Sequence, residues 1–172
     1  MKNEKSILFI FSGLPGVGKT TLAQQLASHK NAVYLRIDTI EQALRDLCSV
    51  DVQGEGYRLS YRIAADNLRL KSSVVADSCN PIDLTRKEWE QVAINENANF
   101  VNVEIICSDQ EEHRKRVETR QAIVSGLLLP TWAEVESREY ESWTKPRILI
   151  DTACKTMAES FDELLSKLSY LV

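Results

Sequence analysis

A glycine-rich segment near the start of the chain constrains the fold more than any other feature of the sequence. It has the pattern G-x-x-x-x-G-K-T over residues 13–20, between a short apolar run at 6–11 and a run with apolar residues at helical spacing at 21–27. In this context the backbone N–H groups of the loop turn inward on a polyphosphate, and the following helix N-terminus adds partial positive charge. The segment therefore predicts a phosphate-binding loop between a buried strand and a helix.

The same motif predicts a nucleoside triphosphate ligand, and we expect the cofactors ATP and Mg²⁺. Lys19 places a full positive charge near the phosphates and has a catalytic role, while the Thr20 hydroxyl is a ligand for Mg²⁺. The residues of this segment expected to bind the nucleotide are Gly13, Leu14, Pro15, Gly16, Val17, Gly18, Lys19, Thr20 and Thr21.

Length and charge narrow the possible partners. A chain of 172 residues is long enough for one hydrophobic core, so we expect a single domain over residues 1–172 that holds both nucleotide and substrate. The net charge of −4 gives no general attraction to nucleic acid or anionic membranes and favours a small-molecule partner. Both a monomer and a homodimer fit the sequence.

The cysteines and apolar segments predict a cytoplasmic protein. The four cysteines form no C-x-x-C pair, which favours buried free thiols in a reducing compartment. The first apolar stretch runs directly into the phosphate loop, so we interpret it as a strand and not a signal peptide. No later segment approaches the length of a membrane span.

Strand and helix patterns alternate along the chain. This order predicts an α/β fold with three layers, in which a five-stranded parallel sheet is covered by helices on both faces. Capping boxes predict helix starts at Thr85, Ser108 and Thr131, and two irregular stretches, residues 50–55 and 121–130, are expected to be mobile lids. The expected strands cover residues 6–11, 32–38, 73–77, 100–107 and 147–151.

Two aspartates follow predicted strands. Asp38 ends the second strand, and Asp77 ends the third. In a parallel sheet both would lie at the edge that carries the phosphate loop. We expect Asp38 to be the general base that contacts the substrate hydroxyl, or to cap the helix beginning at residue 39. Asp77 is expected to hold Mg²⁺ through water, or to form the turn that follows it.

Arginines supply further candidates. Arg116 and Arg120 are four residues apart on a predicted helix at 109–123, and we expect them to stabilise the charge of a transferring phosphoryl group. A solvated helix face is the alternative for residues 114–120. Arg45 could bind an anionic group of the substrate or be an ordinary exposed helix arginine. His29 and His113 have no partner at metal-ligand spacing, so we expect surface roles and no zinc chemistry.

Several of these segments together resemble the AAA-type small kinases. This group is similar to chloramphenicol phosphotransferase, gluconate kinase, the zeta toxins and the 5′-kinase domain of polynucleotide kinases. The segments that carry the resemblance are residues 13–21, 35–38 and 76–81, the pair Arg116 and Arg120, and residues 150–153.

The resemblance implies a nucleoside-monophosphate-kinase-like fold with a lid at about 114–147. It also implies that Asp38 is the base, that Arg116 and Arg120 contact adenine and phosphates, and that Thr152 lies near the adenine. Asn80, three residues after Asp77, is a substrate contact by similarity to the polynucleotide kinases. The segment 47–69, expected to bind the acceptor, matches no group of known specificity.

Three functions remain consistent with the sequence. The leading hypothesis is an ATP- and Mg²⁺-dependent phosphotransferase that acts on a hydroxyl of a small molecule. The second is a polynucleotide 5′-hydroxyl kinase, against which the acidic charge and the absence of an obvious strand-binding groove count. The third is a nucleotide-switched binding protein that hydrolyses ATP slowly.

Overall fold

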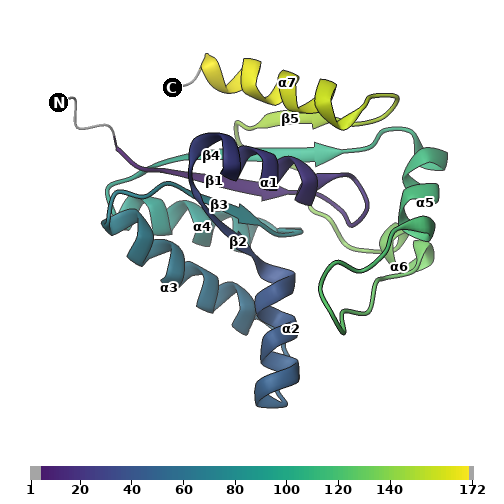
Figure 1. Cartoon of the computed structure of the whole chain (residues 1–172), viewed down its shortest axis with the longest axis horizontal. Coiled ribbons are helices and arrows are strands. Elements are labelled where there is room, and N and C mark those ends of the chain that lie inside the picture. Colours follow the sequence, from purple (N-terminus) through teal and green to yellow (C-terminus); the bar gives the residue numbers. More distant parts are fainter. Residues whose placement is uncertain (1–4, 171–172) are drawn as a thin grey trace.

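A parallel β-sheet forms the centre of the computed structural model, which describes residues 5–170 (Figure 1). Residues 1–4 and 171–172, which the predicted domain of residues 1–172 includes, lie outside the described residues. The strand order is β2-β3-β1-β4-β5, and every neighbouring pair is parallel. The strands are β1 (Ile7–Ser12), β2 (Val33–Arg36), β3 (Val74–Asp77), β4 (Asn99–Ile106) and β5 (Ile148–Asp151).

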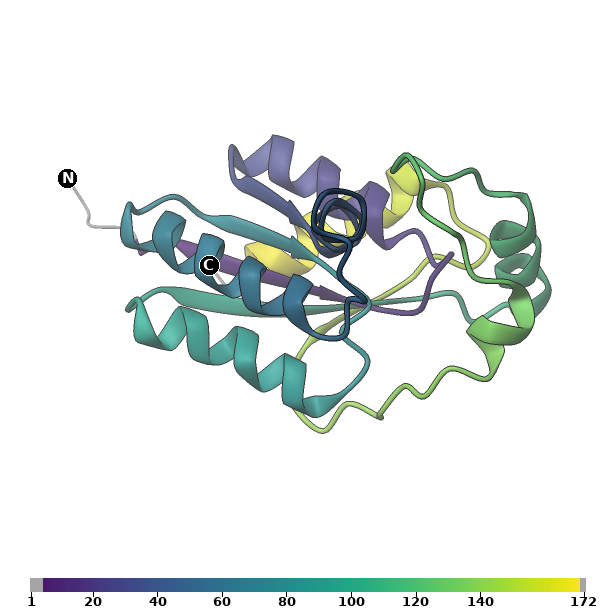
Figure 2. The ribbon, with the colours of Figure 1, turned by 90° about the horizontal axis from the view of Figure 1, so that it is seen from below.

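Helices cover both faces of the sheet, as Figures 1 and 2 show. One face packs on α1 (Lys19–Lys30) and α7 (Met157–Ser169), and the other on α3 (Glu55–Arg69) and α4 (Asp83–Asn95). The predicted fold class is therefore confirmed. The remaining helices lie beyond the carboxyl ends of the strands: α2 (Ile37–Cys48), which projects away from the sheet, α5 (Gln110–Thr119) and α6 (Trp132–Glu136).

The central strand shows why the chain forms two cores. Alternate side chains of a strand point to opposite faces of its sheet. In β1, Phe9 and Phe11 join the core beneath α1 and α7, whereas Leu8 and Ile10 join the core beneath α3 and α4. All four are at most 1% exposed. Burial on both faces thus fixes β1 in the middle of the sheet, and with it the loop that leaves its carboxyl end.

Some predicted boundaries are wrong. Helix α4 begins at Asp83 and has Ile82 as its N-cap, so Thr85 with Glu88 forms no capping box. Helix α5 has Asp109 and not Ser108 as its N-cap, because the Asp109 carboxylate accepts the N–H of Glu112. The capping box at Thr131 is present and begins α6.

The cysteines are free but not buried. Cys48 and Cys154 are exposed, and Cys79 and Cys107 are partly exposed, which corrects the expectation of buried thiols. Within residues 5–170, no helix is both long enough and apolar enough to cross a membrane.

Candidate active site

The loop between β1 and α1 has a backbone that requires glycine at three positions. Gly13, Gly16 and Gly18 have φ angles of 144°, 89° and 93°, which L-residues with a side chain rarely adopt. A Cβ atom on Gly16 would lie 2.5 Å from Cγ2 of Val117, and one on Gly13 would lie 2.3 Å from the carbonyl oxygen of Ile105. Because α1 begins at Lys19, the loop ends at a helix N-terminus, where N–H groups without intrahelical partners bind phosphate.

Neighbouring elements hold this loop from outside. The Gly13 N–H donates to the carbonyl of Cys79 (3.0 Å), and the Thr152 hydroxyl donates to the carbonyl of Val17 (2.9 Å). His113 Nε2 lies 2.8 Å from the carbonyl oxygen of Pro15. A carbonyl only accepts, so Nε2 carries the proton. The loop is therefore fixed before any nucleotide arrives.

His113 does not have the surface role that we expected. Its side chain is buried against the loop and makes an edge-to-face contact with Trp132, with ring centroids 5.1 Å apart. The position is a consequence of α5, which carries His113 and Val117 one turn apart on the face that packs against the phosphate loop.

A cavity of about 590 Å³ opens at the carboxyl edge of the sheet. Its walls come from the phosphate loop, from the ends of β2 and β3, from α2, and from the segment after α5. The predicted site residues that line it are Pro15, Gly16, Gly18, Lys19, Thr20, Thr21, Asp38, Arg45, Asp77, Arg116 and Arg120.

Asp38 lies in the cavity wall but not at a strand end. Strand β2 stops at Arg36, and Asp38 stands in the first turn of α2, whose N-cap is Arg36. The expected strand ending at Asp38 and the expected N-cap role are therefore wrong. The carboxylate is half exposed (53%), and its Oδ2 lies 3.7 Å from a terminal nitrogen of Arg36. This solvent-facing, weakly paired carboxylate is accessible to a substrate.

Asp77 is nearly buried (3% exposed) at the end of β3, where it pairs in register with Phe11. Its Oδ2 accepts a hydrogen bond of 2.7 Å from the Tyr34 hydroxyl. Burial and the neighbouring Asp77 carboxylate raise the pKa of Tyr34, so the phenol keeps its proton and remains a donor. The structure thus holds the Asp77 carboxylate at the cavity, beside the phosphate loop.

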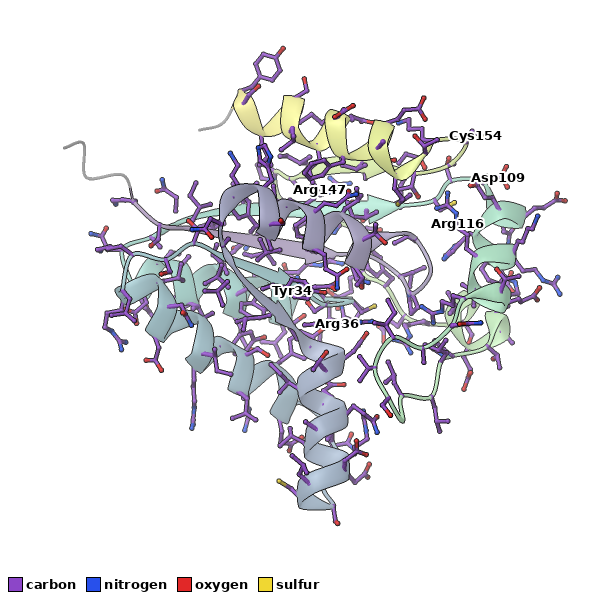
Figure 3. All side chains as sticks on the ribbon, in the orientation of Figure 1. Tyr34, Arg36, Asp109, Arg116, Arg147 and Cys154 are labelled. Atoms are coloured by element: carbon purple, nitrogen blue, oxygen red, sulfur yellow. The ribbon has the colours of Figure 1, made fainter. Side chains whose placement is uncertain are left out.

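Arg116 is anchored to the loop after β5. Its guanidinium donates to the Thr152 hydroxyl (2.8 Å) and carbonyl (3.0 Å) and pairs with Glu112 (Figure 3). Thr152 itself is fully buried and does not line the cavity. From behind the loop it holds the carbonyl of Val17 and the guanidinium of Arg116.

Arg120 does not share a helix face with Arg116. Helix α5 ends at Thr119, and Arg120 has an extended backbone with φ −67° and ψ 151°. Its Nε and Nη2 atoms are buried without an acceptor among residues 5–170. Burial lowers the pKa of the Arg120 guanidinium, opposed by the charge of Asp38.

The two other predicted substrate contacts differ in position. Arg45 lines the cavity and pairs with Glu41 at 3.4 Å. Asn80 is fully buried and lies outside the cavity wall, because its side-chain amide donates to the Ser12 hydroxyl (3.0 Å). Its backbone N–H donates to the Tyr57 hydroxyl (3.0 Å). Gly13, Leu14 and Val17 also lie outside the lining.

The sequence of residues 8–126 matches the family described as AAA domain. This match covers more than half of the chain. The chain belongs to the AAA domain family. The resemblance inferred from the motifs is thereby confirmed.

Solved structures show the same fold as this AAA domain. A gluconokinase from Sinorhizobium meliloti 1021 superposes with a TM-score of 0.70 at 14% identity, over 98% of this chain and 95% of that one. The APS kinase CysC of Mycobacterium tuberculosis, in complex with AMPPNP and APS, gives 0.67 at 17% identity, over 96% and 99%. Chaetomium thermophilum Kti12 in complex with ADP-AlF3 gives 0.67 at 20% identity, over 92% and 97%.

Several cavity residues of this AAA domain were not predicted. Arg36 ends β2 and Arg138 follows α6, while residues 126–130, which also line the cavity, fall in the stretch expected to be a lid. Arg36 stands two residues before Asp38, so its place at the site could have been predicted from the sequence. Arg138 had no comparable signal, because a lone arginine after a short helix is common on protein surfaces.

Proposed function

We propose that this AAA domain is an ATP- and Mg²⁺-dependent phosphotransferase that moves the γ-phosphate to a hydroxyl group of a small molecule. The observation that carries the proposal is that one cavity is lined by Lys19 and Thr20 of the phosphate loop and by the carboxylates of Asp38 and Asp77. A phosphate cradle, a metal ligand and an accessible base in one space are the parts that phosphoryl transfer needs.

The loop fits ATP and Mg²⁺. Gly16 and Gly18, both with positive φ, line the cavity, where a loop of this kind presents backbone N–H groups to phosphate, and Lys19 adds a full positive charge. Thr20 and Asp77 would hold Mg²⁺, which neutralises charge on the phosphates of ATP. Arg116, anchored on Thr152, would contact the nucleotide from the side of α5.

Asp38 would act as the general base in the transfer step. The carboxylate would accept the proton of the acceptor hydroxyl while that oxygen bonds to the γ-phosphorus, and the bond to the β,γ-bridging oxygen breaks. ADP and the phosphorylated acceptor are then the products. Residues of the expected lid, about 114–147, would exclude water from this reaction, since Leu127, Leu128 and Pro130 already form part of the wall.

A small-molecule acceptor is supported by the size of the cavity. Its volume of about 590 Å³ is within the range of small-molecule sites. The names of the gluconokinase and APS kinase that share this fold point to kinases with small acceptors. The acidic net charge of −4 also favours such an acceptor over an oligonucleotide.

The test is ADP release from the purified protein with ATP and Mg²⁺, with pooled hydroxyl-bearing metabolites, antibiotics, nucleosides or 5′-hydroxyl oligonucleotides. We expect one small-molecule pool to stimulate turnover. Asp38→Asn should lower the stimulated kcat by about 10²–10⁴ fold, the usual contribution of a general base, and leave ATP binding intact. Lys19→Ala should abolish nucleotide binding and serves as the positive control for loss.

Two outcomes would overturn the proposal. Stimulation by the oligonucleotide pool alone would assign a polynucleotide 5′-hydroxyl kinase. A slow ADP release that no pool changes, together with an ATP-dependent conformational change, would assign a nucleotide-switched binding protein. An Asp38→Asn variant that retains the full rate would remove the proposed base.

A further inference from the structure

The cavity has more positive than negative charge on its walls. Its carboxylates are Asp38, Glu41 and Asp77. Twice as many cationic side chains line it: Lys19, Arg36, Arg45, Arg116, Arg120 and Arg138.

Half of these cations already have a role or a partner. Lys19 belongs to the phosphate loop. Arg116 is bound to Thr152 and Glu112, and Arg45 pairs with Glu41 at 3.4 Å. Arg36, Arg120 and Arg138 remain, and they come from β2, from the residue after α5 and from the residues after α6. None of the three belongs to the phosphate loop.

Arg36 is largely enclosed. Its side chain is 12% exposed, and its Nε atom is buried without an acceptor among residues 5–170. Its only carboxylate neighbour within 4.0 Å, in the same part of the chain, is Asp38, at 3.7 Å, which is longer than a charge-assisted hydrogen bond. Figure 3 shows Arg36 where β2 meets α2, at the edge of the sheet that carries the site.

Arg120 lies near both other arginines. Its Nε and Nη2 atoms are buried without an acceptor from the described protein. Burial lowers the pKa of Arg120 most, and the charges of Arg36 and Arg138 lower it further, while Asp38 opposes them. Arg138 is exposed and forms no ion pair within residues 5–170. Asp38 is thus the carboxylate that faces both Arg36 and Arg120.

Such a group of arginines destabilises the folded protein when no counter-charge is bound. Arg36 and Arg120 together have three buried nitrogens that carry N–H donors. These donors have lost their hydrogen bonds to water and have no acceptor among residues 5–170. Like charges repel strongly where solvent is partly excluded. A bound carboxylate, sulfate or phosphate group would accept hydrogen bonds from these donors and offset the repulsion between the guanidinium groups. Planar guanidinium groups bind oxyanions through paired N–H donors.

We infer that the acceptor of this kinase carries an oxyanion group, which Arg36, Arg120 and Arg138 bind beside the reacting hydroxyl. The inference rests on the proposed function. Because Arg36 also neighbours Asp38, the bound oxyanion would place the hydroxyl near the base. Arg120 is then an acceptor-binding residue, and not the transition-state cation that its spacing from Arg116 had predicted.

The first test compares matched acceptors in the ADP-release assay. Within each pair, one compound carries a carboxylate, a sulfate or a phosphate, and the other has the same hydroxyl-bearing skeleton without it. Comparison of the carboxylate, sulfate and phosphate pairs then identifies the oxyanion. We expect only anionic members to be efficient substrates. Arg36→Gln and Arg138→Gln should raise KM for the acceptor at least tenfold and change KM for ATP less than twofold.

Arg62→Gln is the matched control. Arg62 is an exposed arginine of α3 that does not line the cavity, so its loss removes one charge without affecting the acceptor. Equal efficiency with neutral and anionic members of each pair, or an unchanged acceptor KM in both arginine variants, would overturn the inference while leaving the kinase proposal intact.

The second test does not need turnover. The protein is saturated with Mg²⁺ and a non-hydrolysable ATP analogue, so that the phosphate loop is filled, and sulfate is titrated against chloride at equal ionic strength. At a hundredfold excess over its dissociation constant, sulfate should raise Tm by roughly 5 °C or more. Arg36→Gln and Arg138→Gln should lose most of this shift, and Arg62→Gln should keep it.

These results separate the two proposals. If no acceptor of any kind is phosphorylated, the proposed function fails, and the sulfate titration alone decides the oxyanion site. A shift that depends on Arg36 and Arg138 supports the site in that case. The absence of a shift in the wild-type protein, or its survival in both variants, overturns it.

Discussion

His113 Nε2 lies 2.8 Å from the carbonyl oxygen of Pro15, so that a residue of α5 is bonded to the phosphate loop 98 residues earlier in the chain. The same helix brings Val117 against Gly16. The loop between β1 and α1 therefore packs directly against α5.

Replacing His113 tests this contact. His113→Phe retains an aromatic edge against Trp132 but removes the hydrogen bond to Pro15. The loss of one hydrogen bond of about 1 kcal/mol should weaken ATP binding by roughly threefold to tenfold, as measured by calorimetric titration. His29→Gln, a change on the exposed end of α1, should leave ATP affinity unchanged. Equal affinity of the His113→Phe variant would show that the hydrogen bond does not order the loop.

Gly16→Ala should be far more damaging. The new Cβ would lie 2.5 Å from Val117 and would stand on a residue with φ of 89°. We expect at least a tenfold loss of ATP affinity and a loss of stability of about 2 kcal/mol, from strain and overpacking together. Both are measurable by titration and by urea unfolding.

A second variant separates the two causes. Adding Val117→Ala to Gly16→Ala removes the contact but not the backbone strain, so it should restore only part of the affinity. Gly54→Ala is the control, because its Cβ would meet nothing within 4 Å. Full rescue by Val117→Ala would contradict the role of φ at Gly16.

Tyr34→Phe tests the buried hydrogen bond that supports Asp77. The variant removes the 2.7 Å hydrogen bond to Asp77 and leaves the rest of the ring. A hydrogen bond to a charged group contributes about 1.5–3 kcal/mol, so the free energy of unfolding should fall by that amount. Urea unfolding provides the measurement, and an unchanged midpoint and slope would argue against the bond.

Arg86 is a buried arginine that holds the chain leading to β5. Its guanidinium donates to the carbonyls of Asn80 and Glu141 and stacks 4.3 Å from the ring centroid of Trp143. Arg86→Lys loses the planar fork and should lower the free energy of unfolding by roughly 1–3 kcal/mol. Amide hydrogen exchange should accelerate in residues 137–147. Arg58→Lys, on the exposed side of α3, should change neither quantity.

The pH dependence of stability should contain a contribution from Glu163. Hydrogen bonds from Lys155 and then Lys167 lower the pKa of Glu163 below its ordinary value of 4.5. The folded state therefore holds this proton less tightly than the unfolded state, so the contribution is present above pH 4.5 and is lost as pH falls through the folded pKa. Glu163→Gln should be less stable than wild type at pH 6 and similar at low pH. A constant difference at every pH would contradict this.

The fold could be predicted because its signals are local and agree with one another. The loop motif, the apolar run before it and the helical spacing after it all indicate the same strand, turn and helix, and alternation along the chain indicates a parallel sheet. Boundaries were less accurate where two readings compete. Ile37 continues the apolar pattern of a strand, but it is the first residue of α2. At the start of α5 the sequence offers two equivalent caps, Ser108 with Glu111 and Asp109 with Glu112, and the structure uses the second.

The site was harder to predict where tertiary contacts decide it. No spacing rule places His113 against Pro15 or brings Arg138 and Arg120 to one cavity, because these residues belong to distant segments. Spacing also misplaced Arg120, since the helix ends one residue before it. Asn80 shows the converse. Its segment suggested a substrate contact, but its side chain is used within the core to hold Ser12.

The position of β1 between β3 and β4 places the phosphate loop on the most constrained strand of the sheet, whereas Arg36 comes from the edge strand β2. An edge strand with one neighbour tolerates substitutions that a central strand does not. Under the proposed function, mutations at the rim of the sheet and in the segment after α5 would change the acceptor preference and leave the phosphate loop untouched. For protein engineering, this separation would make the scaffold a starting point for altered acceptors.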